Sequence, residues 1–121
     1  MDKFKFENLE VWNLSLELSD LVYEITELLP SKEEFNLKSQ MIRACTSVSL
    51  NIAEGSISAS DLEQKRFINI AIRSLIEVIA CIRLIVRRNY ILTEELIETI
   101  NKHCHLLFAK LQAFKKSLNK K

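Results

Sequence analysis

The sequence predicts an all-α fold, an antiparallel up-down-up-down four-helix bundle. Only one glycine and one proline occur among 121 residues, whereas a β-sheet protein of this size needs several tight turns rich in those residues. Apolar residues recur at steps of three and four along most of the chain, which is the spacing of one face of a helix. The length suits one domain, so we expect residues 1–121 to form a single bundle.

The first helix is expected over residues 9–28, with Asn8 as its N-cap and Pro30 just beyond its end. Two neighbouring apolar rows follow this helix. The first row is Val11, Leu14, Leu18, Leu21, Ile25 and Leu28. The second row is Trp12, Leu16 and Tyr23.

The second helix is expected over residues 32–54. Ser31 and Glu34 have the spacing of a capping box, Asn36 is the candidate for a kink, and Gly55 is predicted to be the left-handed C-cap. The inner stripe is Leu37, Met41, Cys45, Val48 and Ile52. The small side chains beside it, which would let a neighbouring backbone approach closely, are Ala44, Thr46, Ser47 and Ser49.

The third and fourth helices are expected over residues 61–88 and 94–118. Ser60 with Glu63 forms a capping-box pattern before the third helix, and Thr93 is the predicted N-cap of the fourth. The third helix carries the rows Ile68, Ile72, Leu75, Ile79, Ile82, Val86 and Ala71, Val78, Ile85. The seam of the fourth is Ile97, Ile100, Cys104, Leu107, Leu111, Phe114 and Leu118.

The second apolar rows on the first and third helices exceed what one bundle needs. Another copy of the same chain is the simplest cover, because exposed apolar patches commonly mark interfaces and most oligomers are symmetric assemblies of one chain. The alternative is that loops and the N-terminal Phe4 and Phe6 cover the excess. The sequence therefore predicts a homo-oligomer.

The sequence indicates a cytoplasmic protein that does not contact a membrane. No signal peptide is visible, and the most apolar stretch, residues 74–86, contains Glu77 and Arg83 and is shorter than the roughly 20 apolar residues that span a bilayer. Three cysteines is an odd number, and they lie within helical patterns, so we expect reduced, buried thiols. They are Cys45, Cys81 and Cys104.

The net charge of +1 is unevenly distributed, with −7 over residues 1–63 and +8 over residues 64–121. Either the halves pair within the fold or the assembly, or the basic half meets an acidic partner. The candidates for contact with nucleic-acid phosphates are Arg66, Arg73, Arg83, Arg87, Arg88, Lys115 and Lys116. Because no aromatic residues interleave with them, a solvated basic face is the alternative.

Glu54 is expected in the last turn of a helix, where the helix dipole disfavours an anion. Arg66 and Arg73 on the third helix would be suitable partners, and Arg73 with Glu77 has the spacing of an i,i+4 pair. We interpret these residues as a polar cluster that fixes the register of the helices, with an acid or anion site between helices as the alternative. The cluster is Arg43, Asn51, Glu54, Arg66, Arg73 and Glu77.

No catalytic or metal-binding motif is found. The chain has no Gly-rich phosphate loop, no G-x-S-x-G, no H-E-x-x-H and no C-x-x-C. His103 and His105 flank Cys104, but helix residues two apart point about 200° from each other, and Cys104 belongs to the core seam. We therefore expect no enzyme, no cofactor and no metal.

Short motifs along nearly the whole chain point to a known family. The most specific is Asn51-Ile52-Ala53-Glu54-Gly55, strengthened by its spacing from Arg43-Ala44 and Ser74-Leu75. The other matching residues are Leu9-Glu10-Val11-Trp12, Gln40, Ser47, Phe67, Ala71 and Glu77. With these motifs the chain resembles the four-helix bundle proteins encoded in intervening sequences of bacterial 23S ribosomal RNA genes.

The resemblance implies a left-handed bundle that assembles into a five-fold ring, a pentamer without enzymatic activity. The same fold is shared by the accessory protein of diversity-generating retroelements, which binds nucleic acid and a reverse transcriptase. By that similarity we expect a homo-oligomer that binds structured RNA or DNA. The alternative, favoured by the near-neutral net charge, is a protein-interaction or scaffold ring with no nucleic-acid role.

Two residues depart from the family pattern. Ser58 occupies a loop position where the family usually has arginine, which removes a basic contact. Arg73 stands where the family usually has glycine, which adds a charge to the same surface or supplies a partner for Glu54. Neither departure disturbs the predicted bundle.

Overall fold

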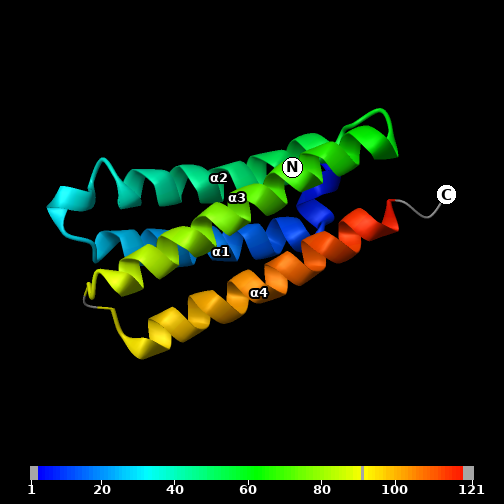
Figure 1. Ribbon diagram of the computed structural model, residues 1–121. Helices are drawn as coiled ribbons and strands as arrows, with labels where there is room; N and C mark the ends of the chain where they lie inside the picture. Colours follow the sequence, from blue (N-terminus) through cyan, green and yellow to red (C-terminus); the bar gives the residue numbers. More distant parts are fainter. Residues whose placement is uncertain (1–2, 91, 119–121) are drawn as a thin grey trace.

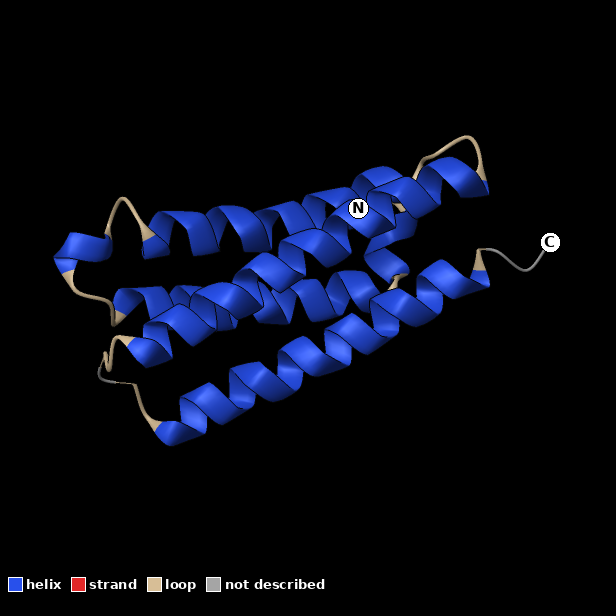
Figure 2. Ribbon diagram, in the orientation of Figure 1, coloured by secondary structure: helices blue, strands red, loops and turns tan. Residues whose placement is uncertain are grey.

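The computed structural model describes residues 3–90 and 92–118 and confirms the predicted fold class. Helices are joined by short connections, and the described residues contain no strand (Figure 2). The four long helices are α1 (Glu10–Glu27), α2 (Leu37–Ser56), α3 (Asp61–Arg87) and α4 (Glu94–Ser117). Two short 3-10 helices, η1 (Lys5–Asn8) and η2 (Ser31–Glu33), precede α1 and α2.

The helices form a square bundle in chain order. Each helix packs along the next, and α4 closes the square by packing along α1. Consecutive helices run antiparallel (Figure 1), so α1 and α3 lie on one diagonal and α2 and α4 on the other. The most extensive contact is between α2 and α3.

The start of α1 differs from the prediction. Leu9, not Asn8, is the N-cap, and its side chain makes no capping hydrogen bond. Asn8 is the last residue of η1, a turn held by the Phe4 N–H, which donates to the Glu7 carboxylate at 2.8 Å. Because this turn fixes the chain up to Asn8, the Asn8 side chain cannot serve as the cap of α1.

The start of α2 also differs. Ser31 does not cap a helix; the chain instead forms η2, in which Glu34 N–H donates to the Ser31 carbonyl at 3.1 Å. The expected kink at Asn36 is a full break, with φ −127° and ψ −102°, and α2 begins at Leu37. The break separates η2 from α2 and lets the Glu33 side chain turn inward, where it is buried.

The prediction that Gly55 is a left-handed C-cap is wrong. Helix α2 continues through Ser56, and Gly55 is a buried helical residue without a positive φ. A Cβ atom at Gly55 would lie 3.1 Å from the Cβ of Phe67 on α3. Glycine is therefore explained by the close approach of the two helices rather than by helix termination.

The predicted caps of the last two helices are confirmed. Ser60 Oγ accepts a hydrogen bond from Glu63 N–H at 3.1 Å, and Thr93 Oγ1 accepts one from Leu96 N–H at 3.1 Å. Helix α3 ends at Arg87 and α4 at Ser117, each one residue earlier than predicted. After α3, Asn89 adopts φ 57°, a left-handed conformation that asparagine tolerates better than most residues.

The core contains most of the predicted apolar rows. The predicted stripe of α2 and the three cysteines are buried. In α1 the buried face is rotated, so Ser15 and Val22 are buried while Leu28 is exposed. The rotation follows from a contact between small residues, because Ser49 Oγ donates to Ser15 Oγ at 2.9 Å. None of the described helices combines the length and apolar content that a membrane crossing requires.

Replacing Gly55 by valine tests the close packing of α2 and α3. We expect Gly55→Val to lower the free energy of unfolding by about 1–3 kcal/mol, because its extra methyl groups have no room beside Phe67. Gly55→Ala is the matched control, since its gain in helix propensity of about 1 kcal/mol offsets the tight contact. Urea denaturation followed by circular dichroism measures both. A Gly55→Val variant as stable as the parent would show that the helices are not closely packed here.

Candidate functional site

The motif residues at the contact between α2 and α3 serve packing. Ser74 Oγ on α3 donates to Ser47 Oγ on α2 at 2.9 Å. Asn51 Nδ2 donates to the Ser47 carbonyl at 2.8 Å and to its hydroxyl oxygen at 3.1 Å. Together with Gly55, these short side chains satisfy their own polar groups while the helices approach closely.

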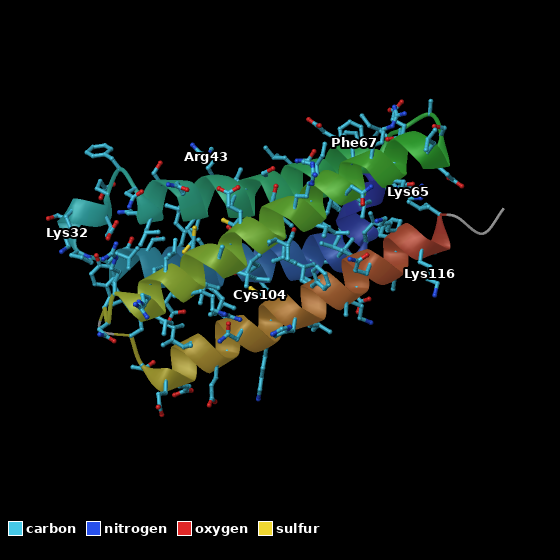
Figure 3. The ribbon with its side chains drawn as sticks, viewed as in Figure 1. Lys32, Arg43, Lys65, Phe67, Cys104 and Lys116 are labelled. Carbon is cyan, nitrogen blue, oxygen red and sulfur yellow. The ribbon has the colours of Figure 1, made fainter. Side chains whose placement is uncertain are left out.

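The charged members of the predicted polar cluster do not pair with one another. Arg43, Glu54, Arg66, Arg73 and Glu77 are all exposed, and none forms an ion pair within 4.0 Å with a described residue. The predicted i,i+4 ion pair between Arg73 and Glu77 is therefore not formed. Figure 3 shows the Arg43 side chain pointing away from the bundle. The register of the helices is set by small polar side chains, not by these charges.

The predicted basic residues are spread along the molecule. Arg66 and Arg73 share one outward stripe of α3, and Arg87 is 21 residues beyond Arg66, about 31 Å along the helix axis. Lys115 and Lys116 lie at the end of α4, on the side of the bundle where α3 begins (Figure 3). None of these five cations forms an ion pair with a described residue.

The other two predicted basic residues, Arg83 and Arg88, differ in their surroundings. Arg83 Nη1 donates to Asn101 Oδ1 of α4 at 2.8 Å. Arg88, just after the end of α3, lines a pocket at the far end of the bundle. The two halves of the chain meet electrostatically at Lys110 and Glu10, where Nζ and Oε1 are 3.3 Å apart. Both side chains are well exposed, so this ion pair adds little to stability.

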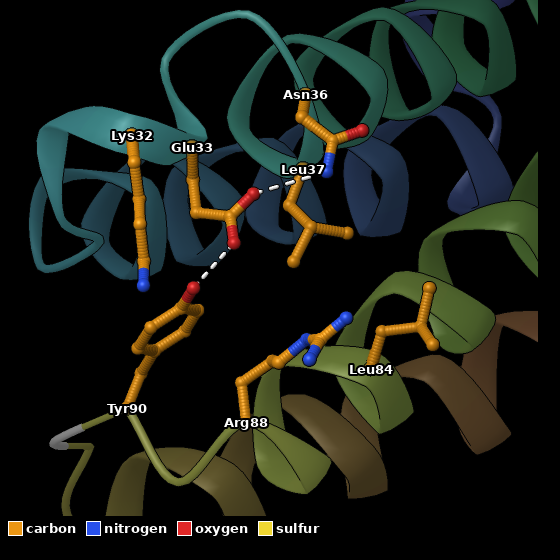
Figure 4. A pocket seen from close by; sticks show the side chains of 7 residues that line it. All are labelled: Lys32, Glu33, Asn36, Leu37, Leu84, Arg88 and Tyr90. Carbon is orange, nitrogen blue, oxygen red and sulfur yellow. Dashed lines mark hydrogen bonds between the residues drawn. The ribbon is translucent and has the colours of Figure 1, made fainter.

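The pocket, which we call the end pocket, has a volume of about 350 Å³. It lies where the connection before α2 meets the end of α3 (Figure 4). Its lining residues are Lys32, Glu33, Asn36, Leu37, Leu84, Arg88 and Tyr90. Of these, sequence analysis identified only Arg88 as functional, because residues 32–37 and 84–90 come together only through the antiparallel packing of α2 and α3.

A buried carboxylate connects the two sides of the end pocket. Glu33 is only 7% exposed. Its Oε2 accepts a hydrogen bond from the Tyr90 hydroxyl, and its Oε1 accepts one from Asn36 Nδ2 at 3.1 Å (Figure 4). The hydrogen bond from Tyr90 is the main cause that lowers the pKa of Glu33, and the Arg88 guanidinium adds to it. The same bond raises the pKa of Tyr90.

A second feature is an uncharged surface along α1 and α2, which we call the α1/α2 surface. It lies on the outer side of the contact between Ser15 and Ser49. It includes exposed Leu16, Tyr23 and Leu50. Its full set is Trp12, Leu16, Tyr23, Ile42, Thr46, Leu50, Ala53 and Ile57.

The N-terminal aromatic residues cover only part of this surface. Phe6 packs edge-on against Trp12, with ring centroids 4.6 Å apart, and Phe4 stacks on Phe6. Leu16 and Tyr23 remain about half exposed. The second apolar row of α3, by contrast, is buried within the bundle. Apolar side chains nevertheless remain exposed on α3 as well as on α1 and α2, and those of α3 include Ile70, Ile76, Leu84 and Val86. The excess of apolar surface predicted on the first and third helices is therefore present, and α2 adds to it.

The three thiols and the His103 imidazole lie in packed surroundings. Burial raises the pKa of the Cys104 thiol to about 11, and it also raises the pKa values of Cys45 and Cys81. His103 Nε2 lies 2.7 Å from the Leu14 carbonyl oxygen on α1. Within residues 3–90 and 92–118, no three His, Cys, Asp or Glu side chains gather in a way that would hold a metal ion.

These features define the class of the protein, an up-and-down four-helix bundle with an uncharged surface on one pair of helices and arginines along another helix. The family model described as 23S rRNA-intervening sequence protein matches residues 7–113. The chain therefore belongs to the 23S rRNA-intervening sequence protein family.

A solved structure supports the same assignment. The chain is similar to a crystal structure of a protein of unknown function from the S23 ribosomal protein family of Bacteroides thetaiotaomicron, with 27% sequence identity and a TM-score of 0.78. The match covers 88% of this chain and 95% of that one. The comparison with curated proteins finds no significant match.

The bond between Glu33 and Tyr90 should make stability depend on pH at both ends of the range. The pKa of Glu33 lies below its ordinary value of 4.5, so its contribution is present above pH 4.5 and is lost as the pH falls toward the folded-state value. The pKa of Tyr90 lies above its ordinary value of 10.0, so its contribution is present below pH 10.0 and is lost as the pH rises through the folded-state value.

Tyr90→Phe tests this link. Without the hydroxyl donor, the pKa of Glu33 rises toward 4.5, and we expect a smaller loss of stability on acidification than in the parent. Thermal melts at a series of pH values from about 7 to 3 measure it. Tyr23→Phe is the control, because Tyr23 is exposed on α1 and its hydroxyl has no hydrogen bond to a described residue. An acid profile of Tyr90→Phe that superimposes on the parent's would contradict the link.

Proposed function

We propose that this protein is a non-enzymatic module that assembles with copies of itself and binds structured RNA or DNA through the outer side of α3. The observation that carries the proposal is the outward stripe of α3, where Arg66, Arg73 and Arg87 project without an ion pair to any described residue. Unpaired arginines on a rigid helix suit phosphates, which accept paired hydrogen bonds from a guanidinium.

The spacing of these arginines favours a structured nucleic acid. They extend over about 31 Å of one straight helix, close to the length of one turn of duplex DNA, roughly 34 Å. No aromatic residue lies on this stripe, so contacts to the phosphate backbone, rather than base stacking, supply the affinity.

The non-enzymatic part rests on the titratable groups. A cysteine nucleophile needs a lowered pKa, and all three thiols have raised values. Glu33, the buried carboxylate, has a lowered pKa and is fully engaged in hydrogen bonds, which suits a structural anion rather than a general acid.

The α1/α2 surface supports self-assembly. Exposed apolar side chains without charge between them commonly mark protein interfaces. In a square bundle this surface lies opposite the pair formed by α3 and α4. A neighbouring copy bound there would leave the α3 arginines free for nucleic acid. The five-fold ring that the family resemblance implies is part of this proposal.

Binding to a fluorescent RNA hairpin and to duplex DNA across a salt series tests the nucleic-acid role. We expect Arg66→Gln/Arg73→Gln/Arg87→Gln to bind at least tenfold more weakly and to reduce the slope of log K against log salt by about 2–3, roughly one counterion per lost phosphate contact. Lys5→Gln/Lys38→Gln/Lys102→Gln is the control, since it removes the same charge elsewhere. Absence of parent binding at about 50 mM salt would rule out this role.

A scaffold ring without a nucleic-acid role is the second candidate, and the α1/α2 surface favours it. Both candidates require self-assembly, which the mass in solution tests. We expect the parent to have several times the 14.1 kDa chain mass, five times for a pentamer, and Leu16→Glu/Leu50→Glu to dissociate while remaining helical. Leu106→Glu, at an exposed position on α4, is the control. A parent of single-chain mass would refute self-assembly.

A further inference from the structure

A second hollow of about 350 Å³ adjoins the end pocket. The second hollow is lined by Leu28, Pro30, Lys32, Asn89 and Tyr90. Lys32 and Tyr90 line both hollows, so the two hollows lie side by side with these residues between them, and we call the pair the groove. Each hollow lies near the lower end of the range of roughly 300–1,000 Å³ that small-molecule sites occupy.

The groove carries positive charge that the protein does not neutralise. The Glu33 carboxylate is occupied by the Tyr90 hydroxyl and the Asn36 amide, and its negative charge offsets only one cation. Neither the Lys32 ammonium nor the Arg88 guanidinium has a hydrogen bond or an ion pair within 4.0 Å among the described residues. One net positive charge therefore remains, which favours an anionic ligand.

The remaining walls favour a flat or apolar group. Leu37 and Leu84 line the end pocket, and Leu28 and Pro30 line the second hollow. The Tyr90 ring between them offers an aromatic face, on which a base can stack. Arg88 projects from the end of α3 into the end pocket, and its guanidinium suits a phosphate better than a compact ammonium does (Figure 4).

From this arrangement we propose that the groove binds a 5′-nucleoside monophosphate, either free or as the phosphorylated end of a strand. Arg88 and Lys32 hold the phosphate, and the base lies against Tyr90 in the second hollow. Inorganic phosphate would lose the stacking, and a nucleoside would lose both cationic contacts, so each fragment should bind more weakly than the whole.

Binding of adenosine 5′-monophosphate, measured by calorimetry and by amide shifts in ¹H–¹⁵N spectra, tests the proposal on the full chain. We expect AMP to shift the amides of Leu37, Arg88 and Tyr90 and to bind at least tenfold more tightly than adenosine or inorganic phosphate. Arg88→Gln and Lys32→Gln should each weaken AMP binding about tenfold, because each removes a charge-assisted hydrogen bond. Lys102→Gln, on α4 away from the groove, should leave it unchanged.

Three results would overturn the proposal: no AMP binding, shifts confined to other residues, or Arg88→Gln binding like the parent. The source of the nucleotide follows from two RNA oligonucleotides of one sequence, with a 5′-phosphate or a 5′-hydroxyl. If the protein prefers the oligonucleotide with the 5′-phosphate and Arg88→Gln abolishes this preference, the ligand is the end of a strand. If AMP binds but the two oligonucleotides bind equally, the ligand is a free nucleotide. The Arg66→Gln/Arg73→Gln/Arg87→Gln variant should bind AMP normally, so failure of the α3 interface and failure of this site are distinguishable.

Discussion

The close packing of α2 against α3 is the constraint on which the rest of the structure depends. Gly55 leaves no Cβ where α2 faces Phe67, and the hydroxyl groups of Ser47 and Ser74 meet at 2.9 Å. These short side chains permit one register only, because a shift by one residue would put a larger side chain opposite Phe67. Since the two helices are antiparallel, this register also fixes which residues meet at each end of the bundle.

At one end, the register places the start of α2 beside the end of α3. Glu33 and Tyr90, 57 residues apart in sequence, thereby come within hydrogen-bonding distance. A carboxylate that leaves water must regain its hydrogen bonds, and the break at Asn36 lets Glu33 reach Tyr90 while Asn36 donates to it. The interruption between η2 and α2 thus follows from a tertiary contact, and the groove is built around that contact.

The difference between local and tertiary contacts explains how much of the structure could be predicted from the sequence. Ser60 and Thr93 cap helices through neighbours three residues away, and the stripe of α2 is a repeat within one helix, so both could be predicted. Gly55 is typical of a helix C-cap, but here it is required by the close contact of α2 with α3. Ser31 is typical of an N-cap, but here it lies in η2, whose Glu33 forms a hydrogen bond with Tyr90. The groove could not be predicted, because its residues form no motif in the sequence. They come together only when the segment before α2 packs beside the segment after α3.

The bundle places the acidic and the basic residues of the chain on different sides. The acidic side chains of α1 and the arginines of α3 belong to helices on one diagonal, so they cannot neutralise each other within the chain. The exposed acidic residues of α1 are Glu10, Glu17, Asp20, Glu24 and Glu27. They repel a polyanion from their side of the bundle, while the α3 side attracts it. A near-neutral protein can therefore present one basic side, and an assembly through the α1/α2 surface would keep that side turned outward.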